Sequence, residues 1–169
     1  MGSVAAATAP RRAYTTVRRA VATDLAPMLA LLRLDATASG GAFSPEAACR
    51  GLQILTADQR ALVLVAERGG AVVGFASMQE HFEIATATRF GMIGDLVVPR
   101  EAAPLRIEEE LVAAVVRHAQ KRELGGILLM VERGRAVELV ARIGRCWSSS
   151  GRLMLCHERR PTETSALAH

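Results

Sequence analysis

Apolar residues along this chain recur with the period of a strand, about two residues, or with that of a helix, about 3.6 residues. The changes from one period to the other divide the chain into predicted strands and helices. Alternating or continuous apolar runs of strand length are bounded by glycines and polar residues. Segments whose apolar residues lie three and four positions apart predict amphipathic helices. The expected strands are 14–20, 61–67, 71–79, 89–98, 126–132 and 151–158, and the expected helices are 23–34, 44–55, 104–123 and 136–144.

Individual residues support several of these boundaries. Thr23 and Ser44 precede the first two helices and carry oxygens suited to helix capping, and Pro45 occupies a favourable first helical position. The turn at 68–70 contains two glycines and joins two apolar strands, which predicts a hairpin. Two more glycines at 125–126 are expected to stop the long helix.

The resulting order is β-α-α-β-β-β-α-β-α-β, which predicts an α/β fold. We expect a mixed sheet of six to seven strands with helices on both faces. Residues 1–13 and 161–169 are predicted to be disordered tails around a single domain at 14–160.

Composition narrows the class of protein. Half of the 169 residues are apolar, so one domain can bury a core without metal or disulfide support. The three cysteines are widely spaced, which indicates neither a disulfide framework nor a metal site. No apolar run approaches the ~20 residues that span a bilayer, so we expect a soluble, cytoplasmic protein without a membrane partner.

The charge pattern argues against nucleic acid as a partner. The net charge is +4, but the basic residues form scattered pairs, such as Arg11–Arg12, among many acidic ones. Aromatic residues make up only 4% of the chain, so no platform for stacking bases is visible. An anionic cofactor fits a mildly basic surface equally well.

Three phrases, taken in order, resemble the GNAT superfamily of N-acetyltransferases. "TTVRRAVATDLAPMLALL" is similar to the opening strand and first helix of that family, and "LVLVAERGGAVVGFASM" to its second and third strands, with Gly74 where a "V-G" phrase recurs. "IGDLVVPRE" is similar to its fourth strand and the start of its cofactor loop. The likeness covers about residues 14–158.

The resemblance implies an acetyl-CoA-dependent N-acetyltransferase. In that family the pantetheine arm pairs with the backbone of the fourth strand, which corresponds to Leu96, Val97 and Val98. The pyrophosphate lies on backbone N–H groups of the following loop, and a primary amine attacks the thioester. The acceptor is therefore expected to be a small-molecule or peptide amine, and a homodimer is a further expectation because exposed strand edges favour pairing.

The cofactor loop departs from the family pattern. Its glycine-rich window corresponds to residues 103–108, which contain Ala103, Pro104, Arg106 and Glu108 and no glycine. Proline lacks an N–H donor, and glutamates in a first turn satisfy the helix dipole and repel phosphate. Arg100 and Arg106 are the candidate replacements for the lost phosphate donors.

The last helix shows a second departure, because Val140 stands where the family has the tyrosine that protonates the leaving thiolate. Cys146, His157 or water are the remaining donors. On the fourth strand, Asp95 is the candidate that accepts the amine proton. Its alternative is a strand carboxylate paired with Arg18 or Arg89.

Glu80 and His81 follow the third strand and have two interpretations. They line the substrate side of such a fold, or they are solvated loop residues, which we favour. Three hypotheses for the whole chain follow: an acetyltransferase with an atypical cofactor loop, which leads; a variant of it whose cofactor loop lies elsewhere in the sequence; and a catalytically inactive domain that binds, regulates or pairs with a partner.

Overall fold

The computed structural model describes residues 14–129, with the side chains of 103–105 outside the description. Five strands, three α-helices and two short 3-10 helices lie in this range. In chain order they are β1 (Thr15–Arg19), η1 (Ala22–Asp24), α1 (Leu25–Ser39), α2 (Pro45–Ala57), β2 (Ala61–Arg68), β3 (Ala71–Glu83), β4 (Thr88–Val97), η2 (Arg100–Leu105), α3 (Ile107–Lys121) and β5 (Ile127–Leu129). The helix expected at 136–144, the strand expected at 151–158 and both predicted tails lie outside the described residues.

The strands form one mixed sheet in the order β1-β2-β3-β4-β5. The pairs β1–β2, β2–β3 and β3–β4 are antiparallel, and β5 runs parallel to β4. This confirms the predicted mixed α/β architecture. Five strands are described where six to seven were expected, and the further expected strand falls beyond Leu129.

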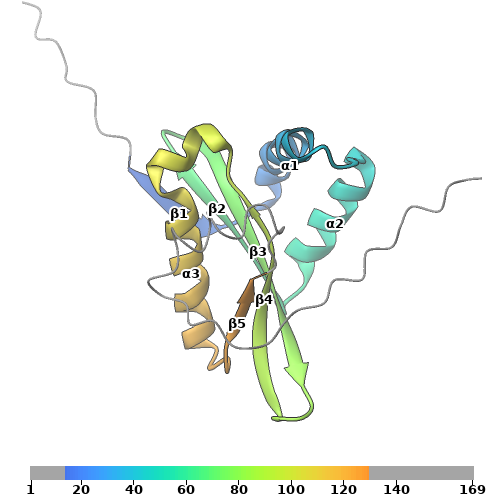
Figure 1. Cartoon of the computed structure of the whole chain (residues 1–169), viewed down its shortest axis with the longest axis vertical. Helices are drawn as coiled ribbons and strands as arrows, with labels where there is room; N and C mark the ends of the chain where they lie inside the picture. The colour runs from blue at the N-terminus through green and yellow to red at the C-terminus, as the bar shows by residue number, and fades with distance from the viewer. Residues whose placement is uncertain (1–13, 130–169) are drawn as a thin grey trace, which may run out of the picture.

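Helices cover both faces of the sheet (Figure 1). On one face, α3 packs its apolar side onto a cluster that includes Leu62, Met78 and Ile93. On the other, α1 and α2 cover a second cluster that includes Val65 and Phe75. Since strand side chains alternate between faces, this division assigns a face to the polar residues of β3 and β4 as well.

The start of α1 differs from the prediction. The chain passes through η1 first, and Asp24, not Thr23, occupies the N-cap position of α1, although its side chain makes no capping hydrogen bond to that helix. The buried Asp24 carboxylate accepts hydrogen bonds from the Arg18 guanidinium at 2.7 and 2.9 Å and from the Val21 N–H at 2.8 Å. The hydrogen bonds from Arg18 lower the pKa of Asp24 against the opposing effect of burial. The hydrogen bonds of Asp24 with Arg18 and Val21 thus take precedence over the capping signal of Thr23.

The start of α2 and the first hairpin agree with the prediction. The Ser44 hydroxyl accepts a hydrogen bond from the Ala47 N–H, and Pro45 is the first helical residue. Gly69 and Gly70 both have positive φ, which explains the two glycines in this turn.

Both ends of α3 differ from the prediction. The helix begins at Ile107 and not at Pro104, because residues 100–105 form η2 and Arg106 adopts a left-handed conformation with φ of 56°. At the other end, the left-handed residue after the helix is Glu123, with φ of 53°, and not a glycine. None of the helices within 14–129 is both long enough and apolar enough to cross a bilayer.

Candidate active site

Asp95 lies on β4 and is hydrogen-bonded to Ser77, its cross-strand neighbour on β3. The Ser77 hydroxyl, which is buried, donates to the Asp95 carboxylate. Ser77 also pairs with Val63, whose side chain belongs to the cluster under α1 and α2, so both polar side chains lie on that face. Arg18 forms an ion pair with Asp24, and Arg89 forms one with Glu80, so the alternative that paired Asp95 with either arginine does not hold.

A β-bulge precedes Asp95. Asp95 pairs with Ser77 and Ile93 pairs with Met78, so Gly94 is an extra residue without a partner on β3. Gly94 is exposed, and a side chain here would lie 3.7 Å from the Ser77 hydroxyl. A bulge bends the strand and changes the direction of adjacent side chains, so this one sets the position of Asp95.

Leu96 and Val97 end β4 and Val98 follows it; these three residues are called the β4 exit. The side chains of Leu96 and Val98 pack into the α3 cluster, while Val97 packs into the α1 and α2 cluster. Pairing with the described part of β5 ends at Ile93, opposite Leu129. The side chains of Leu96, Val97 and Val98 thus pack into the core, and only their backbone groups are available to a ligand.

Gly74 sets how closely the exit of β4 approaches β3. A Cβ at this position would lie 2.9 Å from Val98 Cγ2 and 3.1 Å from both Ile107 Cγ2 and the Val97 carbonyl oxygen. The "V-G" phrase therefore serves close packing between β3, the β4 exit and the first turn of α3.

Arg100 and Arg106 lie at the two ends of the segment between β4 and α3. Arg100 is exposed at the start of η2, and the Arg106 side chain is 74% exposed. The Arg106 guanidinium forms an ion pair with Glu109, and this hydrogen bonding raises its pKa. Both side chains are therefore charged and accessible at the predicted phosphate loop.

The three glutamates in the first turn of α3 do not form a single acidic surface. Glu108 is buried, Glu109 is half-buried and bound to Arg106, and Glu110 is exposed. Their carboxylates point in different directions, because successive residues of a helix are about 100° apart.

Glu80 is structural, so the favoured view of it as a solvated loop residue was wrong. Its side chain is only 6% exposed and accepts hydrogen bonds from Arg122, the residue after α3, and from Arg89 on β4. The hydrogen bond from Arg122 is the main reason that the pKa of Glu80 is lowered despite burial. Glu80 therefore ties the end of α3 to the sheet.

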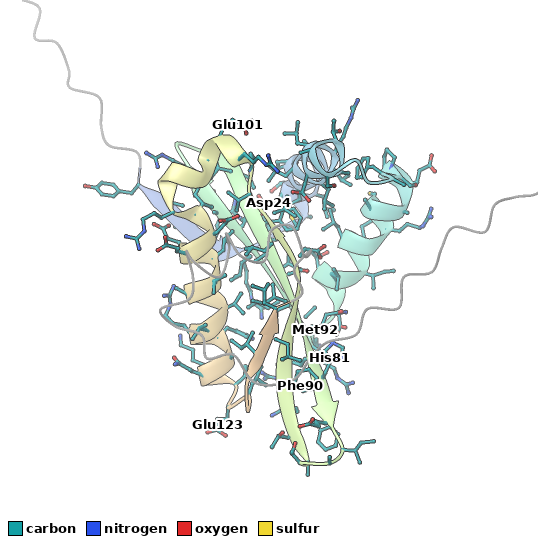
Figure 2. All side chains as sticks on the ribbon, viewed as in Figure 1. Asp24, His81, Phe90, Met92, Glu101 and Glu123 are labelled. Carbon is teal, nitrogen blue, oxygen red and sulfur yellow. The ribbon has the colours of Figure 1, made fainter. Side chains whose placement is uncertain are left out.

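His81 points to the face opposite Glu80 and stacks on Phe90. Their ring centroids are 5.5 Å apart with an interplanar angle of 21°. His81 Nε2 is buried without a hydrogen-bond partner. Phe90 and Met92 share this face by strand alternation, and the bulge at Gly94 returns Asp95 to it. Figure 2 shows His81, Phe90 and Met92 close together. His81 therefore lies within β3 and not in a solvated loop, and its role on the substrate side stays a prediction.

Two expectations about the site concern metals and the proton donor. Within residues 14–129, no group of three or more potential ligands is placed to hold a metal ion. Val140, Cys146 and His157 lie outside the described residues.

Comparison with known proteins identifies the family. Residues 28–144 match the family model described as Acetyltransferase (GNAT) family, and the chain belongs to this family. A comparison with curated protein sequences gave no match.

Solved structures of this family share the fold. A ribosomal-protein-alanine N-acetyltransferase from Brucella melitensis biovar Abortus 2308 has a TM-score of 0.69 at 17% identity, over 86% of this chain and 99% of the other. The aminoglycoside N-acetyltransferase AAC(6')-Iy in complex with CoA has a TM-score of 0.74 at 13% identity, over 90% and 100%. A predicted acetyltransferase with acetyl-CoA from Clostridium acetobutylicum has a TM-score of 0.69 at 12% identity, over 85% and 96%.

Sequence reasoning missed two residues of the site. Gly94 carried a usable signal, because a glycine inside an apolar strand often marks a bulge. Ser77 carried none, since its role depends on the register between β3 and β4.

Proposed function

We propose that this protein is an N-acetyltransferase that transfers the acetyl group of acetyl-CoA to a primary amine, with Asp95 as the catalytic proton acceptor. The observation that carries the proposal is the position of Asp95 directly after the Gly94 bulge, with its carboxylate held by Ser77. Family membership supports acyl transfer as the reaction class.

In the proposed reaction, the acceptor nitrogen forms a bond to the acetyl carbonyl carbon as the carbon–sulfur bond breaks. Asp95 takes the proton lost by the amine, directly or through water. The hydroxyl of Ser77 holds the carboxylate in one orientation, so that the other oxygen is directed to the amine. Solvent protonates the leaving thiolate.

The β4 exit and the segment after it offer groups for two parts of the cofactor, the pantetheine arm and the pyrophosphate. Backbone groups of Leu96, Val97 and Val98 follow the bulge and would pair with the pantetheine arm. Gly74 allows this segment to lie close over β3. The charged side chains of Arg100 and Arg106 would bind the pyrophosphate in place of a glycine-rich loop, because guanidinium groups bind phosphate bidentately.

The acceptor side is the surface shared by Asp95, Met92, Phe90 and His81. It presents a carboxylate for an amine and an aromatic ring that stacks on the ring of His81. These features suit an amine carried by a small molecule or a peptide. The aminoglycoside and ribosomal-protein acetyltransferases of similar fold act on one acceptor of each kind by name. We retain a cytoplasmic location and a homodimer as part of the proposal.

Asp95→Asn tests the catalytic assignment. Asparagine retains an oxygen that accepts from Ser77 but removes the proton acceptor, so we expect kcat/KM to fall by about 10²–10⁴-fold with an unchanged KM for acetyl-CoA. The measurement is acetylation of an amine panel over a range of pH.

The control for that test is Asp58→Asn, a change of the same chemistry at an exposed position. Asp58 accepts a hydrogen bond from the Arg60 N–H before β2, which asparagine preserves. An Asp95→Asn enzyme with the rate of the control would remove Asp95 from the mechanism.

A further inference from the structure

A hollow of about 350 Å³ lies at the end of the molecule opposite the predicted cofactor loop. It forms where β2 begins, because β3 and β4 continue past Ala61 as a projecting hairpin (Figure 1). The described residues that line it are Arg60, Glu80, His81, Phe82, Arg89 and Arg122. Its volume is within the range of small-molecule sites.

Three arginines from three different parts of the fold meet at this hollow. Arg60 precedes β2, Arg89 lies on β4, and Arg122 follows α3. The backbone fixes the first of these, because the Arg60 carbonyl accepts a hydrogen bond from the Glu80 N–H at 3.0 Å. The others are fixed by their ion pairs with the Glu80 carboxylate. The fold therefore orders two of the guanidinium groups and the backbone of the third arginine.

The ion pairs leave donors on these arginines for a ligand. Arg89 uses Nη1 and Arg122 uses Nε and Nη2 to bind Glu80, while each guanidinium has five N–H donors. Their side chains remain 51% and 45% exposed. Among the described residues, the Arg60 guanidinium has no ion pair or hydrogen bond in the structure.

Charge favours one class of ligand. Three arginines and one ionised glutamate leave the hollow with a net charge of +2. A carboxylate ligand neutralises one of these charges, whereas a phosphate monoester carries a charge of about −1.5 to −2 at pH 7 and matches both. Phe82, 61% exposed at the rim, adds an apolar surface for the rest of such a ligand.

The hollow is distinct from the cofactor region. Arg89 and Val97 are eight residues apart on β4, which corresponds to about 27 Å along a strand. Figure 2 shows His81 and Phe90 at one end of the molecule and Glu101, in η2, at the other. A CoA pyrophosphate at the β4 exit therefore does not account for the arginine cluster.

We propose that this hollow is a second anion site, which binds a small phosphate monoester through Arg60, Arg89 and Arg122. Glu80 positions two of the guanidinium groups and keeps the total charge low enough for them to share one site. The site does not depend on the catalytic assignment of Asp95.

The test is calorimetric titration of the full chain with phenyl phosphate and with inorganic phosphate at constant ionic strength. We expect a dissociation constant on the order of 1 mM or lower for phenyl phosphate, and weaker binding of inorganic phosphate, which lacks the ring that contacts Phe82. Arg60→Ala and Arg89→Gln should each weaken binding by about tenfold or more, since each removes a charged hydrogen bond.

The control is Arg117→Gln, which removes the same charge from an exposed position on α3 that does not line the hollow. Arg122 and Glu80 stay unchanged, so that α3 remains attached to the sheet. Saturating acetyl-CoA should leave the phosphate affinity unaltered. Absence of binding, equal loss in Arg117→Gln, or displacement by acetyl-CoA would overturn the proposal.

Discussion

Arg106 combines a left-handed backbone conformation with an exposed, charged side chain. Its backbone has φ of 56°, a conformation that glycine adopts without cost and other residues at about 1–2 kcal/mol. Its side chain is a charged, exposed guanidinium at the predicted phosphate loop. A residue that bears this backbone cost and supplies a phosphate-binding group fits a cofactor loop that uses side chains where the family uses backbone N–H groups.

Arg106→Ala separates these two roles, because alanine keeps the backbone cost and removes only the guanidinium. We expect acetyl-CoA affinity to fall by about tenfold, since a charged hydrogen bond contributes ~1.5–3 kcal/mol. Equilibrium binding of acetyl-CoA is the measurement. If Arg106→Ala or Arg106→Gly binds more tightly than the parent, the guanidinium obstructs the phosphates and our assignment is wrong.

At the scale of the elements, the approach of the β4 exit to β3 depends on Gly74. A side chain there would contact Val98 and Ile107, which hold the exit and the first turn of α3 in place. The position of the β4 exit thus depends on a packing contact between residues that are themselves uncharged.

We therefore expect Gly74→Ala to lower the free energy of unfolding by about 1–3 kcal/mol and to weaken acetyl-CoA binding, because the added methyl group displaces the β4 exit. Thermal unfolding and equilibrium binding measure the two effects.

Gly51→Ala is the matched control for this change. Gly51 lies inside α2, and a Cβ there meets nothing within 4 Å. That variant should be more stable by ~0.5–1 kcal/mol, since alanine is the better helix former. If Gly74→Ala behaves like Gly51→Ala, the β4 exit tolerates displacement.

The elements also show what the sequence could and could not predict. Periodicity located the five described strands and the three α-helices, because burial on one face of a sheet or helix imposes it, but it did not predict the two 3-10 helices. Boundaries failed where a side-chain contact decides them, as at the start of α1, where the Asp24 carboxylate binds Arg18, because periodicity does not encode such contacts. Glu80 was misassigned for the same reason, since Arg122 is 42 residues away in the sequence.

The candidate site was predicted less completely than the fold. Asp95 was chosen from its place at the end of a strand, but its hydrogen-bond partner is the buried Ser77, which the sequence did not suggest. From the sequence alone, an acidic residue could pair with any of many arginines. The register of β3 and β4 decides the neighbour of Asp95, which is Ser77.

At the scale of the whole molecule, the two ends of β4 have different chemistry. The exit of β4 combines the bulge, Asp95 and the segment that leads through η2 into α3. At the other end, where β4 begins, Arg89 joins Arg60 and Arg122 around Glu80. Two anion-binding regions at opposite ends of one strand would give the protein one site for its acyl donor and one for a phosphorylated ligand.

Thermal unfolding of the purified protein with and without acetyl-CoA tests the central claim most directly, with desulfo-CoA as a ligand that cannot donate an acyl group. A ligand at a hundred times its dissociation constant stabilises by ~2.7 kcal/mol, so the account predicts that the midpoint rises by several degrees with both ligands. An unchanged midpoint at millimolar acetyl-CoA would contradict the proposed acetyltransferase and favour the catalytically inactive domain.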